Sequence, residues 1–159
     1  SNEHVIRFVK RNFHDRNSVI LDFGCGAGRN AIALAMEGYN IIAMDYREEA
    51  VELAREKSLE RLLDIEFLVN KNTDIPLKTA SVNAIVANGS LFYNDWNTTI
   101  KLLSNLHDVL SENGLMWADW RTKEDSLYAM GEETEKDFFK MNEESGRKGC
   151  YIIFLMNNN

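Results

Sequence analysis

Residues 19–37 have the sequence VILDFGCGAGRNAIALAME, in which a short apolar run meets a glycine-rich turn and then a segment rich in helix-forming residues. The apolar run, Val19 to Phe23, is typical of a buried strand in a parallel sheet. Glycines in the turn allow positive φ angles and let a ligand approach the backbone closely. In open α/β sheets, ligands bind in the crevice at the carboxyl ends of the strands. The stretch therefore predicts a strand, a ligand-binding turn and a helix.

The alternation of strand and helix continues along the chain. Further strands are expected at residues 40–45, 65–69, 82–87 and 115–120, and helices at residues 3–13, 29–37, 47–63 and 98–110. Residues 70–81 are polar, contain the only proline, and are expected to form a loop. Strands that alternate with helices favour right-handed βαβ units. The predicted fold class is α/β: a Rossmann-like, doubly wound, mostly parallel sheet with helices on both faces.

The pattern changes after Trp120. Residues 123–141 are polar and acid-rich, and we expect short helices there. Residues 150–156 (CYIIFLM) are strand-like, and an unpaired apolar strand at a chain end would favour aggregation. We therefore expect the C-terminal strands to be incomplete and the chain to be truncated.

Composition argues against several classes of partner. The 159 residues include 25 acidic and 18 basic ones, for a net charge of -7, and no basic cluster is large enough to bind a nucleic-acid backbone. No apolar run approaches the roughly 20 residues that cross a bilayer. Cys25 and Cys150 have neither disulfide-framework nor metal-site spacing. We expect no nucleic acid, membrane or metal partner, and a cytoplasmic location with reduced thiols.

Two features refine the prediction for the glycine turn. A dinucleotide fingerprint has its third glycine at the sixth position, where this chain has Arg29; the third glycine is instead Gly28. Asp22 would repel a pyrophosphate but suits the ammonium of a methionine-like ligand, or it pins the turn by accepting backbone N–H bonds.

Asp45 ends the second strand about twenty residues beyond the turn, where an acid can bind ribose hydroxyls. Alternatively, Asp45 caps the helix that begins near Arg47.

Three segments together resemble the successive motifs of class I S-adenosylmethionine-dependent methyltransferases. They are residues 19–35 (VILDFGCGAGRNAIALA), 41–57 (IIAMDYREEAVELAREK) and 75–94 (IPLKTASVNAIVANGSLFYN). The resemblance covers roughly residues 19–120 and is strongest to the small-molecule type found in bacteria. It implies S-adenosylmethionine as cofactor, S-adenosylhomocysteine as product, and methyl transfer to a small-molecule acceptor by in-line displacement. It also implies one methyltransferase domain over residues 1–159, with a cofactor-binding core at 19–120 and an acid-rich segment at 121–159.

The resemblance further implies a set of cofactor contacts. They are Asp22 beneath the methionine moiety; Gly24, Cys25, Gly26 and Gly28 in the cofactor loop; Asp45 at the ribose hydroxyls; Tyr46 beside the adenine; and Asn88, Gly89 and Ser90 at the methionine end. Many relatives have an acid that contacts the adenine amino group where this chain has Lys71. Asn72 or the local backbone is expected to substitute for it.

The acceptor is expected to lie over the transferred methyl group, near the end of the fourth strand and after the fifth. The candidate contacts are Phe92, Tyr93, Trp96, Trp120 and Arg121, and ordinary packing is an equal alternative for the aromatic ones. Tyr93 and Asp95 are the candidate bases, although a base is optional. The alternatives to an enzyme of this kind are a non-catalytic S-adenosylmethionine-binding regulatory module and a nicotinamide-dependent oxidoreductase. Asp22 and Arg29 disfavour the oxidoreductase.

Overall fold

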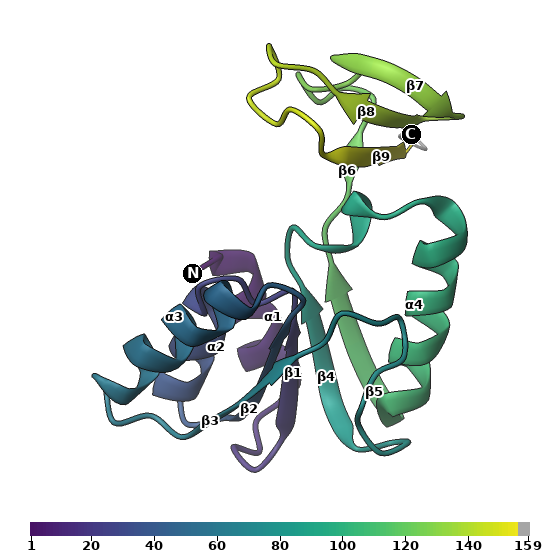
Figure 1. Cartoon of the computed structure of the whole chain (residues 1–159). Helices are drawn as coiled ribbons and strands as arrows, with labels where there is room; N and C mark the ends of the chain where they lie inside the picture. Colours follow the sequence, from purple (N-terminus) through teal and green to yellow (C-terminus); the bar gives the residue numbers. More distant parts are fainter. Residues whose placement is uncertain (156–159) are drawn as a thin grey trace.

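The computed structural model describes residues 1–155 and contains two sheets (Figure 1). The larger sheet has five parallel strands in the order β3-β2-β1-β4-β5. Its strands are β1 (Val19–Phe23), β2 (Asn40–Asp45), β3 (Ile65–Val69), β4 (Val82–Ala87) and β5 (Leu110–Ala118). From β1 the chain first adds β2 and β3 on one side and then crosses to add β4 and β5 on the other. At such a switch point the connections leave in opposite directions, which opens a crevice at the carboxyl ends of the strands. The prediction of a parallel, Rossmann-like sheet is confirmed.

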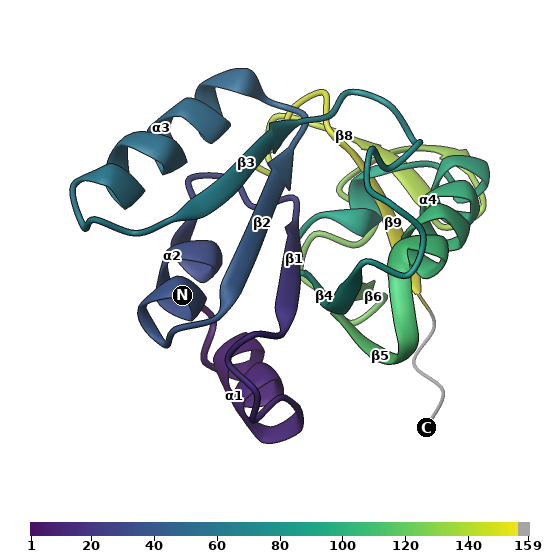
Figure 2. The same ribbon diagram turned by 90° about the horizontal axis from the view of Figure 1, so that it is seen from below.

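Helices cover both faces of this sheet, as predicted. Three helices pack on one face and α4 packs on the other (Figures 1 and 2). The helices are α1 (Glu3–Asn12), α2 (Arg29–Met36), α3 (Glu48–Leu59) and α4 (Trp96–Val109). Successive strand residues point to opposite faces, so Ile20 packs with α1–α3 while Leu21 packs with α4, and both are fully buried. Both faces of β1 are therefore core, which explains its continuous apolar sequence.

A second sheet lies beyond the carboxyl ends of β4 and β5 (Figure 1). It has the order β6-β9-β8-β7, made of β6 (Arg121–Thr122), β7 (Gly131–Glu135), β8 (Phe138–Met141) and β9 (Tyr151–Leu155). A short 3-10 helix after β4, η1 (Leu91–Tyr93), contributes Phe92 to a core shared with Phe139 and Phe154 of the second sheet. This shared core holds the second sheet against the end of the first.

Two expectations for the C-terminal part are wrong. Residues 123–141 contain the strands β7 and β8 in place of short helices, because Phe138, Phe139 and Met141 are buried by packing and pairing with other strands. That pairing is long-range, and a local composition does not reveal it. The terminal strand was expected to be unpaired, yet β9 pairs with β6 on one side and β8 on the other. Met156, the last residue of the expected strand, lies outside the described residues.

Several element boundaries also differ from the prediction. α3 ends at Leu59 and not at residue 63, because the chain turns through Leu62, whose φ is 55°. Leu62 is 95% exposed and does not belong to the buried face of the helix. β5 begins at Leu110, directly after α4, because that residue pairs with Val82 before the strand bulges.

Candidate functional site

The glycine turn between β1 and α2 is bonded to the end of β2. The backbone N–H groups of Gly24 and Cys25 both donate to the carbonyl oxygen of Met44, at 2.8 and 2.9 Å. The N–H of Gly26 donates to Oδ2 of Asp45 at 2.8 Å. These bonds hold the turn beside the carboxyl end of β2, at the edge where the sheet opens.

Two of the turn glycines have no room for a side chain. Gly24 has a φ of +74°, and a Cβ there would lie 2.3 Å from Cβ of Ser90. Gly28 has a φ of +76°, and its Cβ would lie 2.8 Å from Cβ of Ala54. Both the backbone conformation and the close approach of neighbouring elements therefore require glycine. This explains the first and third glycines of the G-x-G-x-G spacing.

Asp45 is only 5% exposed, and its carboxylate links two loops. In addition to its bond with Gly26, Oδ1 accepts from the N–H of Arg47 at 2.9 Å and lies 3.5 Å from the guanidinium of the same residue. Asp45 is not the N-cap of α3, because Arg47 occupies that position and the bond from the Arg47 N–H to Asp45 lies before the first turn of the helix. Each carboxylate oxygen can accept more than one hydrogen bond, so Asp45 retains capacity for a ligand hydroxyl.

Asp22 is 1% exposed and bonds within the protein. Its Oδ2 accepts from the N–H of Ala31, at 2.9 Å, in the first turn of α2. The N-cap of α2 is Gly28, which has no side chain to do this, so Asp22 caps the helix in its place. The pKa of Asp22 is raised to about 7, mainly by burial and additionally by the charge of Asp45, against the lowering effect of the Ala31 N–H. The structure therefore shows Asp22 holding the turn and α2 together, which was the structural alternative for this residue. A contact between Asp22 and a ligand ammonium stays a prediction.

The Cys25 thiol of the glycine turn is buried and stays protonated at neutral pH. Burial, followed by the nearby charges of Asp22 and Asp45, raises the pKa of its thiol far above the usual range. Cys25 is buried and Cys150 is exposed, and both are free thiols.

Within residues 1–155, no cluster of three or more His, Cys, Asp or Glu side chains could hold a metal ion. None of the helices in that part of the chain is long and apolar enough to cross a membrane.

The end of β4 is held by the carboxylate of Asp119, which was not predicted from the sequence. Asp119 accepts from the side-chain amide of Asn88 at 2.9 Å and from the N–H of Gly89 at 2.6 Å. Asn88 also accepts from the side chain of Asn30 at 3.2 Å. Asp119 directly follows β5. Asp45 was predicted because it is an acid at the end of a strand, and the same pattern would have indicated Asp119.

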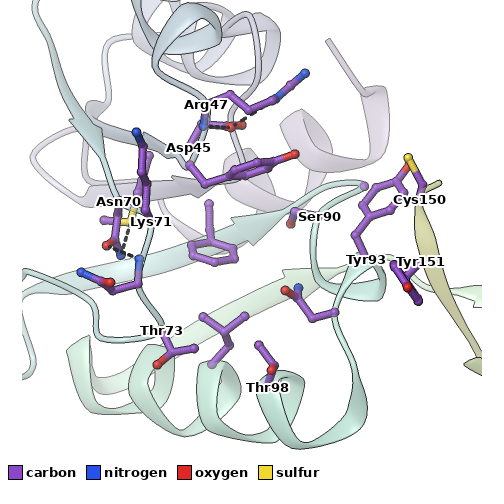
Figure 3. Close-up of a pocket in the computed structure, with 18 of the residues that line it drawn as sticks. Asp45, Arg47, Asn70, Lys71, Thr73, Ser90, Tyr93, Thr98, Cys150 and Tyr151 are labelled. Atoms are coloured by element: carbon purple, nitrogen blue, oxygen red, sulfur yellow. Dashed lines mark hydrogen bonds and ion pairs between the residues drawn. The ribbon is translucent and has the colours of Figure 1, made fainter. Parts of the chain in front are cut away.

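These strand ends surround a pocket of about 940 Å³. Six of the predicted cofactor contacts line it: Gly24, Asp45, Tyr46, Asn72, Gly89 and Ser90. The remaining ones, Asp22, Cys25, Gly26, Gly28 and Asn88, are not among its lining residues. Figure 3 shows Asp45 and Arg47 at one part of the pocket, with Asn70 and Lys71 on one side and Tyr93 on the other. The structure therefore brings six of the predicted contacts together around one pocket, and the other five do not line it.

Of the predicted acceptor contacts, only Tyr93 lines the pocket. Phe92 is 4% exposed and belongs to the core of the second sheet, and Trp120 packs against the same cluster. The indole N–H of Trp96 donates to the carbonyl oxygen of Lys136 at 3.4 Å. Arg121 pairs with an acid of its own turn and lies over the Phe92 ring, 5.1 Å from its centre. Phe92 and Trp120 are therefore packing residues, which was the alternative to substrate contact for the aromatic candidates.

Asp95, one of the two candidate bases, is the N-cap of α4. Its carboxylate accepts from the backbone N–H of Thr98 at 2.7 Å and from the hydroxyl of the same residue at 3.0 Å. The Thr98 N–H is the main cause that lowers the pKa of Asp95 below its usual value. A lower pKa makes a weaker base, so this geometry gives no support to a base role for Asp95.

One side of the pocket is formed by residues that were not predicted from the sequence. Arg147, Gly149, Cys150 and Tyr151 line it from the connection between β8 and β9 and the start of β9. No motif or spacing relates these residues to the glycine turn, because only the packing of the second sheet brings them there.

Comparisons with known proteins agree with this geometry. A family model described as "Methyltransferase domain" matches residues 20–114. A protein of Geobacillus sp. (strain WCH70), whose name marks it as a methyltransferase, is 28% identical over 139 residues, covering 86% of this chain and 55% of its own length. A ubiquinone biosynthesis O-methyltransferase of Rickettsia prowazekii is 37% identical over 67 residues, which are 42% of this chain and 27% of that protein. The chain thus spans about half the length, or less, of these curated relatives.

Solved structures share the fold. A SAM-dependent methyltransferase from Methanosarcina mazei matches with a TM-score of 0.81 and 20% identity, over 93% of this chain and 77% of that one. A SAM-dependent methyltransferase from Aquifex aeolicus matches with a TM-score of 0.64 and 26% identity, over 77% of this chain and 66% of that one. The match to the Methanosarcina structure extends beyond the parallel sheet, because it covers more of the chain than that sheet occupies.

Proposed function

Because the chain belongs to the methyltransferase-domain family, that of the class I S-adenosylmethionine-dependent methyltransferases, we propose that it binds S-adenosylmethionine in the pocket and transfers the methyl group to a small molecule. The proposal keeps the division made from the sequence, with a cofactor-binding core at residues 19–120 followed by a C-terminal segment. The absence of a large basic cluster supports a small acceptor over a nucleic acid. The cytoplasmic location expected from the unpaired cysteines remains part of the proposal.

One observation carries the proposal: the buried carboxylate of Asp45 lies beside the glycine turn and also lines the pocket. A nucleoside needs an acceptor for its ribose hydroxyls, and Asp45 supplies it at the end of β2. Ser90 lines the pocket as well, at the point where the end of β4 approaches Gly24 closely.

The chemistry requires little from the protein beyond positioning. When bound, the cofactor would supply an activated methyl group, which an acceptor lone pair would take from the sulfonium while both electrons of the broken bond stay on sulfur. The product is S-adenosylhomocysteine, and a proton lost by the acceptor goes to solvent. We propose that Gly24, Asp45 and Gly89 orient the cofactor, and that the pocket beside Tyr93 holds the acceptor close to the methyl group.

Calorimetric titration with S-adenosylhomocysteine tests the proposal, with NADH as the control ligand. We expect saturable binding of S-adenosylhomocysteine alone, since the turn lacks a dinucleotide fingerprint. Binding of NADH alone would overturn the proposal in favour of an oxidoreductase. Binding of neither ligand would make the glycine turn purely architectural. Turnover of S-adenosylmethionine with any acceptor then separates an enzyme from a non-catalytic binding module.

A further inference from the structure

The connection between β8 and β9 closes one side of the cofactor pocket. Figure 3 shows Tyr93, Cys150 and Tyr151 grouped on that side, away from Asn70 and Lys71. The proposed ribose contact, Asp45, lies in another part of the pocket. The second sheet therefore adds a separate wall, built from residues that the cofactor motifs do not include.

Arg147 provides the charge of this wall. Its Nη1 donates to the hydroxyl oxygen of Tyr93 at 2.8 Å. Within residues 1–155 no carboxylate pairs with Arg147, although Glu143 of the same connection pairs with Lys148. A guanidinium has several N–H donors in one plane, and the bond to Tyr93 uses only one of them. Arg147 therefore has donors left for an anionic group at the pocket.

The charges around the pocket favour anions. Among the described residues its lining contains a single carboxylate, Asp45, against the three cations Arg47, Lys71 and Arg147. Asp45 is already paired with Arg47, so the two other cations are not neutralised in the pocket. This local excess of positive charge opposes the net charge of -7 of the whole chain. Such a concave positive region concentrates anionic ligands.

We infer that Arg147 and Tyr93 form an acceptor site for a small molecule that carries a carboxylate or phosphate group. The inference rests on the proposed function, because it assigns the rest of the pocket to the cofactor. The planar guanidinium binds either anion through paired N–H donors, and the Tyr93 hydroxyl adds a donor beside it. Tyr93 and Tyr151 also line this wall, so an acceptor with an aromatic body would meet aromatic residues beside the anion site. Arg147 and Tyr93 position the acceptor and take no part in the bond changes.

The test compares Arg147→Gln with Lys148→Gln. The second variant removes the same charge from the neighbouring residue, which is exposed and does not line the pocket. Both variants and the parent protein are first titrated with S-adenosylhomocysteine, and we expect affinities within twofold of one another. Each protein, saturated with S-adenosylhomocysteine, is then titrated with benzoate, phenyl phosphate and the neutral control benzamide, with binding followed by NMR.

We expect the parent protein and Lys148→Gln to bind benzoate or phenyl phosphate saturably, Arg147→Gln to bind at least tenfold more weakly, and benzamide not to bind. Tighter binding of phenyl phosphate than of benzoate assigns a phosphate, and the reverse assigns a carboxylate. Equal binding of benzamide, an equal loss in both variants, or no binding of either anion overturns the inference. A selective loss of S-adenosylhomocysteine affinity in Arg147→Gln also overturns it, because Arg147 would then contact the cofactor. Failure of the parent protein to bind S-adenosylhomocysteine instead overturns the proposed function.

Discussion

Two buried carboxylates at the glycine turn do different work because their partners differ. Asp45 accepts from the N–H groups of two loops and lines the pocket, whereas Asp22 accepts from the first turn of α2 and does not line it. Sequence position alone made both of them candidate ligand contacts. The direction in which each side chain points separates a residue that lines the pocket from one that caps a helix.

Replacement of Asp45 by alanine is expected to weaken S-adenosylhomocysteine binding. The loss should be about 1.5–3 kcal/mol, the usual contribution of hydrogen bonds to a charged group. Calorimetry measures it, with circular dichroism to verify folding. Glu49→Ala is the matched control, since it removes an exposed carboxylate from the first turn of α3. An unchanged affinity in Asp45→Ala would leave that carboxylate with only its role in holding the loops.

Asp22 is expected to make stability depend on pH. Its pKa is about 7 in the folded protein and 3.8 without the fold, so the folded state binds more protons between these values. The free energy of unfolding therefore falls as the pH rises from about 4 to about 7. Asp22→Asn keeps an acceptor for the Ala31 N–H and removes the buried charge. We expect this variant to lose less stability than the parent between pH 5 and pH 8 in urea unfolding; the same slope in both proteins would contradict the expectation.

At the scale of elements, the glycine turn and the end of β4 approach too closely for any side chain at Gly24. Gly24→Ala is expected to destabilise the protein through a strained φ, which costs about 1–3 kcal/mol, and through a clash with Ser90. Gly146→Ala is the control, because its φ is also positive, at +67°, and no atom lies within 4 Å of the added carbon. Urea unfolding should give a clearly larger loss for Gly24→Ala. Equal losses would mean that the turn moves away from β4 without cost.

At the scale of the whole molecule, the second sheet is held to the first by the core around Phe92. Phe92→Ala is expected to cost about 3–5 kcal/mol, the usual loss for a buried phenylalanine. Amide exchange should accelerate in β8 and β9, because this core contains Phe139 and Phe154, and should remain slow in β1 and β2. Phe92→Leu keeps most of the volume and should lose less. Equal acceleration in both sheets would show that the molecule unfolds as one unit.

The predictions from sequence were accurate for features that depend on local order and periodicity. The alternation of apolar strands with helices predicted the parallel sheet, since each element carries its own pattern of burial. The glycine turn, followed at a fixed distance by Asp45, predicted which edge of the sheet opens into the pocket, because parallel strands place their carboxyl ends together. Residues 123–141 have no such pattern, and there the prediction of helices was wrong.

The sequence by itself determined the fold class, the family and the position of the pocket, because these follow from patterns within short segments. The tertiary structure decided how β9 is paired, which aromatic residues are core, and that Asp119 and Arg147 lie at the site. Each of these depends on contacts between residues far apart in the chain. Such contacts arise from packing and long-range strand pairing, so the physical environment of Phe92 or Arg147 exists only once the second sheet has docked.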